Sequence, residues 1–264
     1  MASRLGLRSV ALGYLTLLLG VPVGLVLYRT FEHGLAAPIN SLTSADGAHA
    51  FWLTLEITAI AVPLNTIFGV ATALLLTRRN FPGRSFLSGL VDLPFAVSPV
   101  VVGLALLLVY GRTGWFGGWL TDNGIRVIFS TPGMVLATIF VSLPFVVRET
   151  VPVLQELGTD QEEAAATLGA SSWQTFWRVT LPAIRWGVGY GVVLTTARAL
   201  GEFGAVSVVS GRLVGQTETL TLRVQNEFER FDLTGAYAAS ALLAVMAIAV
   251  LLVMTALERR RRAT

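Results

Sequence analysis

Long apolar segments dominate this chain and set the first limit on its fold. A helix needs about 20 residues to cross the roughly 30 Å of hydrocarbon in a bilayer. Six segments reach this length, at residues 10–28, 52–77, 88–110, 132–150, 184–209 and 235–257. Only 13% of the residues are charged, against about 25% in a soluble domain. The sequence therefore predicts an all-α integral membrane protein with six transmembrane helices.

The first apolar segment has an alternative interpretation as a cleaved signal peptide. Arg4 and Arg8 precede it, and Ala48-His49-Ala50 resembles a cleavage site. However, the apolar region of a signal peptide typically has only 7–15 residues and lies next to its cleavage site. This segment is longer and ends well before that tripeptide. We therefore favour a retained membrane helix.

The arginines predict the orientation of the helices, because basic loops stay in the cytoplasm. All 19 basic residues are arginines; with an inner N-terminus, 12 fall on the inner side and six on the outer side, and Arg198 lies within a segment. Both termini are thus expected in the cytoplasm, in a bacterial inner membrane. The basic run 259–262 can contact anionic lipid headgroups, or act simply as a stop-transfer signal. We divide the chain into an N-terminal helix with an outer loop (1–50), a five-helix core (51–257) and a basic tail (258–264).

The composition argues against several functions. The chain has no cysteine, which excludes disulfides and iron–sulfur clusters. It has no lysine, so it can form neither a P-loop nor a Schiff base. Its two histidines, His33 and His49, form no metal motif. We expect no enzyme activity, no metal, no cofactor and no nucleic-acid partner for the chain itself.

One polar stretch, residues 160–182, interrupts the apolar pattern on the inner side. It reads DQEEAAATLGASSWQTFWRVTLP. Thr159 or Asp160 can cap a first helix, with Glu162 or Glu163 three residues later as in a capping box. Ala164 and Ala165 continue this helix, and Gly169 can supply the left-handed residue that ends it.

A second short helix is predicted after this turn. Ser171 is a suitable cap, with Gln174 three residues later. Trp173, Phe176 and Trp177 then share one helix face. Pro182 is expected to close the unit, so the stretch predicts a helical hairpin that projects into the cytoplasm.

Glycines, prolines and charges within the apolar segments suggest further sites. Gly187 and Gly191, and Ala197 with Gly201, have the small-residue spacing of closely packed membrane helices, either within this chain or against a second subunit. The 88–110 segment contains DLP at 92–94 and Pro99, and is expected to be kinked or unwound near its cytoplasmic start.

Charged groups within the apolar segments are candidates for function. Arg198 and Glu202 can pair across one helix turn, either as a structural pair or as part of an anion path. Arg148 and Glu149 are expected at the cytoplasmic interface.

The polar stretch resembles the EAA loop of ABC-importer permeases. Glu163-Ala164-Ala165, Gly169 and Leu181-Pro182 match its spacing, with Val179 at the branched position. Residues 199–205 (ALGEFGA) are similar to molybdate and sulfate permeases. Residues 92–99, 206–211 and 215–217 resemble, more narrowly, sulfate/thiosulfate permeases of the CysW type. The chain departs from that pattern at Thr221, where a proline is usual, in an expected outer loop.

This resemblance implies a type I ABC importer permease fold and a transport function. Such a subunit pairs with a homologous permease of the CysT/CysU type, a cytoplasmic ATPase dimer of the CysA type and an external sulfate-binding protein. The ATPase would bind ATP and Mg²⁺ and act on the EAA hairpin. The implied coupling residues are Glu162, Glu163, Ala164, Ala165, Gly169, Trp173, Leu181 and Pro182. A molybdate or tungstate importer, and an anion channel that needs no ATPase, are the alternatives.

Overall fold

The computed structural model describes residues 10–32 and 34–263, and every regular element in these ranges is helical. The first helical run, Val10–Phe31, contains a π-helical turn. The elements in chain order are η1 (Thr16–Gly20), α2 (Val21–Phe31), α3 (Ala36–Thr43), α4 (Ala45–Arg78), α5 (Arg84–Ala96), α6 (Pro99–Tyr110), α7 (Gly117–Asp122), α8 (Thr131–Leu157), α9 (Asp160–Thr167), α10 (Ser172–Thr175), η2 (Phe176–Thr180), α11 (Leu181–Leu200), α12 (Gly204–Val209), α13 (Leu220–Glu229) and α14 (Leu233–Ala263).

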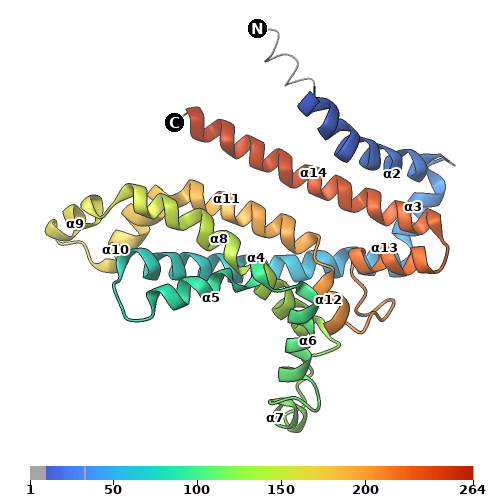
Figure 1. Ribbon diagram of the computed structural model, residues 1–264, viewed down its shortest axis with the longest axis horizontal. Coiled ribbons are helices and arrows are strands. Elements are labelled where there is room, and N and C mark those ends of the chain that lie inside the picture. Colours follow the sequence, from blue (N-terminus) through green and yellow to red (C-terminus); the bar gives the residue numbers. More distant parts are fainter. Residues whose placement is uncertain (1–9, 33, 264) are drawn as a thin grey trace.

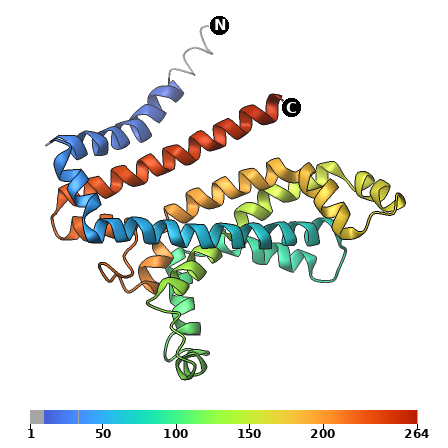
Figure 2. The same cartoon turned by 180° about the vertical axis from the view of Figure 1, so that it is seen from behind.

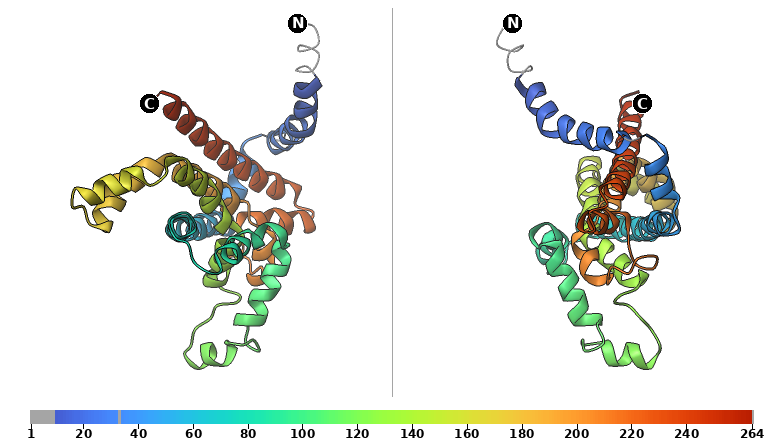
Figure 3. Two further views of the ribbon diagram at one scale, coloured as in Figure 1. Left: turned by 60° about the vertical axis from the view of Figure 1, so that its left-hand side comes forward. Right: turned by 90° about the vertical axis from the view of Figure 1, so that its right-hand side faces the viewer.

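The centre of the molecule is a bundle of α4, α5, α8 and α11 (Figure 1). The α9–α10 hairpin projects from one end of this bundle, and α3 and α13 lie at the other end (Figures 1 and 2). Helices α6 and α7 project from the bundle on the side opposite α2 and α14 (Figure 3). We call the hairpin end the inner end and the α13 end the outer end.

Four helices are long and apolar enough to cross a membrane. They are the run Val10–Phe31, α4, α8 and the part Leu233–Leu257 of α14. Helices α5 and α6 make a fifth span if a bent pair is counted as one. Helix α11 has 20 residues but carries Arg185 and Arg198, which lower its hydropathy. The six-span count therefore stays a prediction.

The 88–110 segment is broken rather than merely kinked. Helices α5 and α6 meet at an angle of 112°, with extended backbone at Val97 and Ser98. Pro99 explains the position of the break, because a proline disfavours helical backbone at the residue before it. Pro94 lies inside α5. The expected interruption is thus confirmed, but it lies at the far end of α5 and not near the cytoplasmic start.

The prediction of one continuous helix over residues 184–209 was wrong. Helix α11 ends at Leu200, and α12 begins at Gly204. Helix α12 packs on α6 near the other break: a Cβ on Gly204 would lie 2.8 Å from Pro99 Cβ, and a Cβ on Gly103 would lie 2.8 Å from the Ala205 carbonyl oxygen. The two interruptions therefore adjoin each other, a contact that hydropathy along the sequence does not reveal.

Three helices meet most closely at Val146, which is fully buried in α8. A Cβ on Gly69 of α4 would lie 2.6 Å from Val146 Cβ, and a Cβ on Gly191 of α11 would lie 2.7 Å from Val146 Cα. A Cβ on Gly187 would similarly lie 2.8 Å from the Glu149 carbonyl oxygen. Gly187 and Gly191 thus pack within this chain. Gly201 ends α11 and makes no comparably close approach.

The core consists of two apolar clusters along the bundle. The inner cluster surrounds Val146 and Leu154, and the outer cluster surrounds Met134 and Val206. Between them, buried Asn65 of α4 donates from Nδ2 to Ser142 Oγ (2.8 Å) on α8. This polar bond fixes the register of α4 against α8, because an unpaired amide would be costly at this depth.

Helix α8 continues to Leu157, nine residues beyond Arg148, so Arg148 lies about 14 Å from the inner end of α8. The position of Arg148 and Glu149 at the membrane interface stays a prediction. Helix α14 continues to Ala263, so residues 258–263 of the predicted basic tail are helical.

A methyl group at Gly191 tests the packing at Val146. Gly191→Ala should lower the stability of the purified complex by about 1–3 kcal/mol, because the new Cβ meets the backbone of α8. Gly189→Ala in the same helix is the control, since its nearest neighbour would be Leu257 Cδ1 at 3.9 Å. Thermal unfolding in detergent measures the effect. Equal melting temperatures for the two variants would contradict this packing.

Candidate functional site: the inner helical hairpin and the charged faces

The turn of the inner hairpin has the geometry expected from its glycine. Gly169 has a φ of +85°, which only glycine adopts at little cost. The Gly169 N–H donates to the Ala166 carbonyl, and the Ala170 N–H donates to the Ala165 carbonyl. These two bonds are a Schellman motif. The glycine turn that the sequence predicted is thus confirmed.

The two helices of the hairpin are capped differently. At α10, the Ser171 side chain accepts from the Gln174 N–H and the Gln174 side chain accepts from the Ser171 N–H, so the expected cap is present. At α9 the predicted capping box was wrong. The Thr159 hydroxyl instead donates to Glu163 Oε1 at 2.7 Å, because the backbone of Thr159 is already nearly helical and the side chain does not reach the free N–H groups.

Glu162 does not cap α9 but connects the hairpin to the bundle. Arg78, the last residue of α4, donates from Nε to Glu162 Oε2 at 2.9 Å. The Thr180 hydroxyl donates to Glu162 Oε1 at 2.8 Å. Arg78 also donates to the carbonyl oxygens of Leu154 and Gly158. We call these groups the Arg78 clamp; it joins the inner end of α4 to α9, to the end of α8 and, through Glu162, to η2.

The aromatic side chains of the hairpin form one cluster. The ring centroids of Trp173, Phe176 and Trp177 are 5.3 to 6.2 Å apart, as the sequence predicted. Phe176 packs against the inner core cluster, whereas Trp173 and Trp177 are exposed. Leu168 at the turn is also exposed. These apolar groups lie at the inner tip, where another protein can bury them.

Along α9, Glu163 and Ala164 are exposed, and Ala165 is half-buried. Leu181 packs against the inner core. Pro182 does not close the hairpin: the chain continues through η2 into α11, and Pro182 lies in the first turn of that helix. Proline is tolerated there because the residue needs no backbone N–H. The expectation of a separate unit was therefore wrong.

Arg198 and Glu202 lie at the break between α11 and α12. Their side chains form an ion pair of 2.7 Å, and Glu202 Oε1 also accepts from the Ala205 N–H at 2.9 Å. The Thr221 hydroxyl donates to the Glu202 carbonyl oxygen. Thr221 was expected in an outer loop but is the second residue of α13. Glu202 therefore accepts from a free N–H of α12 and also pairs with Arg198.

Two charged clusters were missed by sequence reasoning. Arg148 of α8 forms an ion pair with Asp92 of α5, using both Nε and Nη2. Near the outer end, buried Arg223 pairs with Glu218 at 3.3 Å and Glu227 at 3.0 Å. Asp92 and Arg148 are 56 residues apart, so nothing in the sequence pattern indicated that they pair. Arg223 and Glu227 are four residues apart on one helix, and this spacing was a usable signal for an ion pair.

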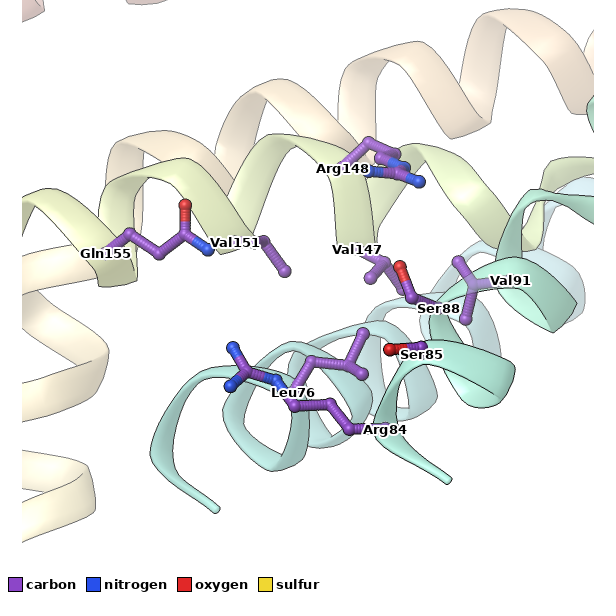
Figure 4. A pocket seen from close by; sticks show the side chains of 9 residues that line it. All are labelled: Leu76, Arg84, Ser85, Ser88, Val91, Val147, Arg148, Val151 and Gln155. Carbon is purple, nitrogen blue, oxygen red and sulfur yellow. The ribbon is translucent and has the colours of Figure 1, made fainter. Parts of the chain in front are cut away.

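A cavity of about 430 Å³ lies beside the Arg148–Asp92 pair. It is lined by Leu76, Arg84, Ser85, Ser88, Val91, Val147, Arg148, Val151 and Gln155. Figure 4 shows the α5 side chains on one wall and the α8 side chains on the other.

The histidines do not contribute a metal site in the part of the chain that the structure describes. His33 lies outside the described residues. His49 Nε2 lies 3.0 Å from the Gln216 carbonyl oxygen. Among the described residues, no group of three His, Asp or Glu side chains is placed to hold a metal ion.

Comparison with known proteins identifies the family. A family model described as "Binding-protein-dependent transport system inner membrane component" matches residues 65–263. The chain belongs to this family. It is 52% identical to the sulfate transport system permease protein CysW of Synechococcus elongatus, over 97% of this chain and 90% of that protein, which places it with the CysW-type permeases.

A more distant relative and a solved structure extend the comparison. The CysT permease protein of the same Synechococcus strain is 38% identical, over 93% of this chain and 88% of that protein. A crystal structure of a bacterial alginate ABC transporter matches 97% of this chain and 93% of its own, with a TM-score of 0.77 at 17% identity. The permease thus has the fold of ABC importer membrane subunits.

The Arg78 clamp can be tested by amide exchange. Arg78→Gln removes the charge-assisted bonds to Glu162, each worth about 1.5–3 kcal/mol, and should speed hydrogen exchange of residues 158–182 about tenfold or more. Arg79→Gln is the control, since Arg79 is the next residue and is exposed. Unchanged protection of the hairpin in Arg78→Gln would contradict the clamp.

Proposed function

We propose that this chain is one permease subunit of an ATP-driven sulfate/thiosulfate importer. The observation that carries the proposal is the match along nearly the whole chain to a sulfate transport system permease, at 52% identity. The exposed hairpin at the inner end supports it, because such a hairpin offers a driving subunit a place to act.

In this proposal the hairpin couples the permease to a cytoplasmic ATPase dimer. The ATPase supplies the P-loop, ATP and Mg²⁺, and this chain has no lysine with which to build a P-loop. Trp173, Trp177 and Leu168 would be buried by the ATPase. The Arg78 clamp would carry the hairpin's movement into α4 and α8. The chain itself then acts as a transport subunit, not an enzyme.

The second permease would be a CysT-type chain. The same Synechococcus strain has both a CysW and a CysT permease protein, and both resemble this chain. Two related but different permeases in one organism support a heterodimer. An external binding protein would deliver the anion, as the alginate transporter complex with its periplasmic protein illustrates for that importer.

The proposed topology has six spans and cytoplasmic termini. Helix α11 would be the fifth span and α14 the sixth. Helix α14 runs back from the outer end toward the hairpin end (Figure 1). The arginine distribution supports the same orientation.

The two helix breaks suggest where the path lies. Irregular backbone at membrane depth is tolerated where it is buried in protein or lines a water-filled cavity. The break between α5 and α6 and the break between α11 and α12 adjoin each other, which supports a path beside them. We propose that the Arg198–Glu202 pair mainly stabilises this region, because Glu202 also caps α12.

Transport by a reconstituted complex tests the proposal. A strain without its own sulfate permeases, given this chain with its partner subunits, should regain ATP-dependent uptake of labelled sulfate. Thiosulfate should compete strongly and molybdate weakly. Uptake of molybdate with none of sulfate would reject the sulfate assignment, and sulfate uptake without an ATPase would indicate a channel.

The exchange variant Arg198→Glu with Glu202→Arg tests the pair in the same assay. Each single change should reduce uptake, and the exchange should restore part of it if the pair is structural. A folded exchange variant with no uptake would instead place Arg198 in contact with the anion.

A further inference from the structure

The cavity between α5 and α8 has the lining of an anion site. Two guanidinium groups, Arg84 and Arg148, line it together with the hydroxyls of Ser85 and Ser88 and the amide of Gln155. Each of these groups can donate hydrogen bonds, and arginine matches the geometry of oxyanions. Asp92 binds Arg148, and Arg84 donates from Nη1 to Asn80 Oδ1 at 3.1 Å. The volume of about 430 Å³ admits an oxyanion with several waters, each of about 30 Å³.

This cavity lies on a face that would be costly to expose to lipid, because it carries charged groups. Arg148 and Asp92 have 48% and 36% of their side-chain surface exposed, although Arg148 belongs to α8, a candidate membrane span. Charged groups at membrane depth face a bundle interior or a water-filled cavity. The break at Pro99, on the same α5–α6 element, independently requires protein or water beside it. This face therefore borders the path or the partner permease.

Asp92 holds Arg148 by a two-point contact, from Nε and Nη2 to the two carboxylate oxygens. A tetrahedral oxyanion presents the same paired oxygens to a guanidinium. Such an anion can therefore replace Asp92 at Arg148, and Asp92 can replace the anion when it leaves. Arg84 begins α5, eight residues before Asp92, which is about 12 Å nearer the inner end.

We propose that this cavity is a transit site for the transported oxyanion in the inner half of the path. Arg148 receives the anion, and Arg84 with Ser85 and Ser88 guides it to the cytoplasm. Asp92 competes for Arg148, so that the anion is bound weakly enough to leave. This role deepens the proposed function and rests on it.

Equilibrium binding of labelled sulfate to the purified complex tests this site. The complex, without binding protein, is placed in nanodiscs of phosphatidylcholine. Arg148→Gln and Arg84→Gln should each weaken binding about tenfold. Asp92→Asn should tighten binding severalfold and slow uptake, because the competing carboxylate is gone. Arg79→Gln, with the same change of charge outside the cavity, should match the wild type.

The outcomes separate this proposal from the proposed function. Wild-type uptake of sulfate with unchanged binding in Arg84→Gln and Arg148→Gln would overturn the transit site alone. If the Asp92–Arg148 pair is only structural, Asp92→Asn should leave the affinity for sulfate unchanged. This result would also overturn the transit site. Absence of sulfate uptake by the wild-type complex would reject the proposed function itself.

A lipid phosphate has the same tetrahedral chemistry, and a second set of nanodiscs distinguishes it. If the substrate anion occupies the cavity, adding phosphatidylglycerol should leave sulfate affinity unchanged. If a lipid headgroup occupies it, sulfate binding should weaken as phosphatidylglycerol increases, and Arg84→Gln should abolish this dependence. That result would overturn the assignment to the substrate.

Discussion

The close approach of α4 and α11 to α8 at Val146 is the contact on which the rest of the structure depends. Gly69 and Gly191 let both helices reach the backbone of α8, and small residues of this kind allow helices to pack closely in lipid. With the three helices fixed there, Arg78 and Thr180 both reach the carboxylate of Glu162. Arg78 also donates to the carbonyl oxygen of Gly158, just beyond α8. The hairpin is therefore attached to the bundle, and a force on its tip reaches α4, α8 and α11 together.

On a second face of the same bundle, two helical segments are broken. Helices α5 and α6 meet at 112°, and α11 and α12 are separated by a short break. The polar groups freed there are partly satisfied by side chains: Glu202 accepts an N–H of α12, and Thr221 donates to the carbonyl of Glu202. Broken helices and charged pairs are costly in contact with lipid. Their grouping on the α5–α6 and α12 side distinguishes this face from the apolar surfaces of α2 and α14.

Sequence reasoning succeeded where structure depends on neighbouring residues. The positive φ of Gly169, the cap at Ser171 and the aromatic face at Trp173 follow from local backbone and helix geometry. It failed where partners are distant in the chain. Arg78 and Glu162 are 84 residues apart, and Asp92 and Arg148 are 56 apart, so neither pair could be recognised from periodicity. The break after Leu200 was missed because apolar residues continue on both sides of it, and hydropathy alone does not mark where a helix stops.

The central claim of this account is that the hairpin tip is the contact point for a cytoplasmic ATPase. Photo-crosslinking in the assembled transporter tests it most directly, with a photoreactive residue in place of Leu168, which is 88% exposed. Phe231, 90% exposed near the outer end, is the matched position. The account predicts that residue 168 crosslinks to the ATPase subunit and that residue 231 does not. An active transporter in which residue 168 gives no ATPase crosslink, or in which residue 231 does, would contradict it.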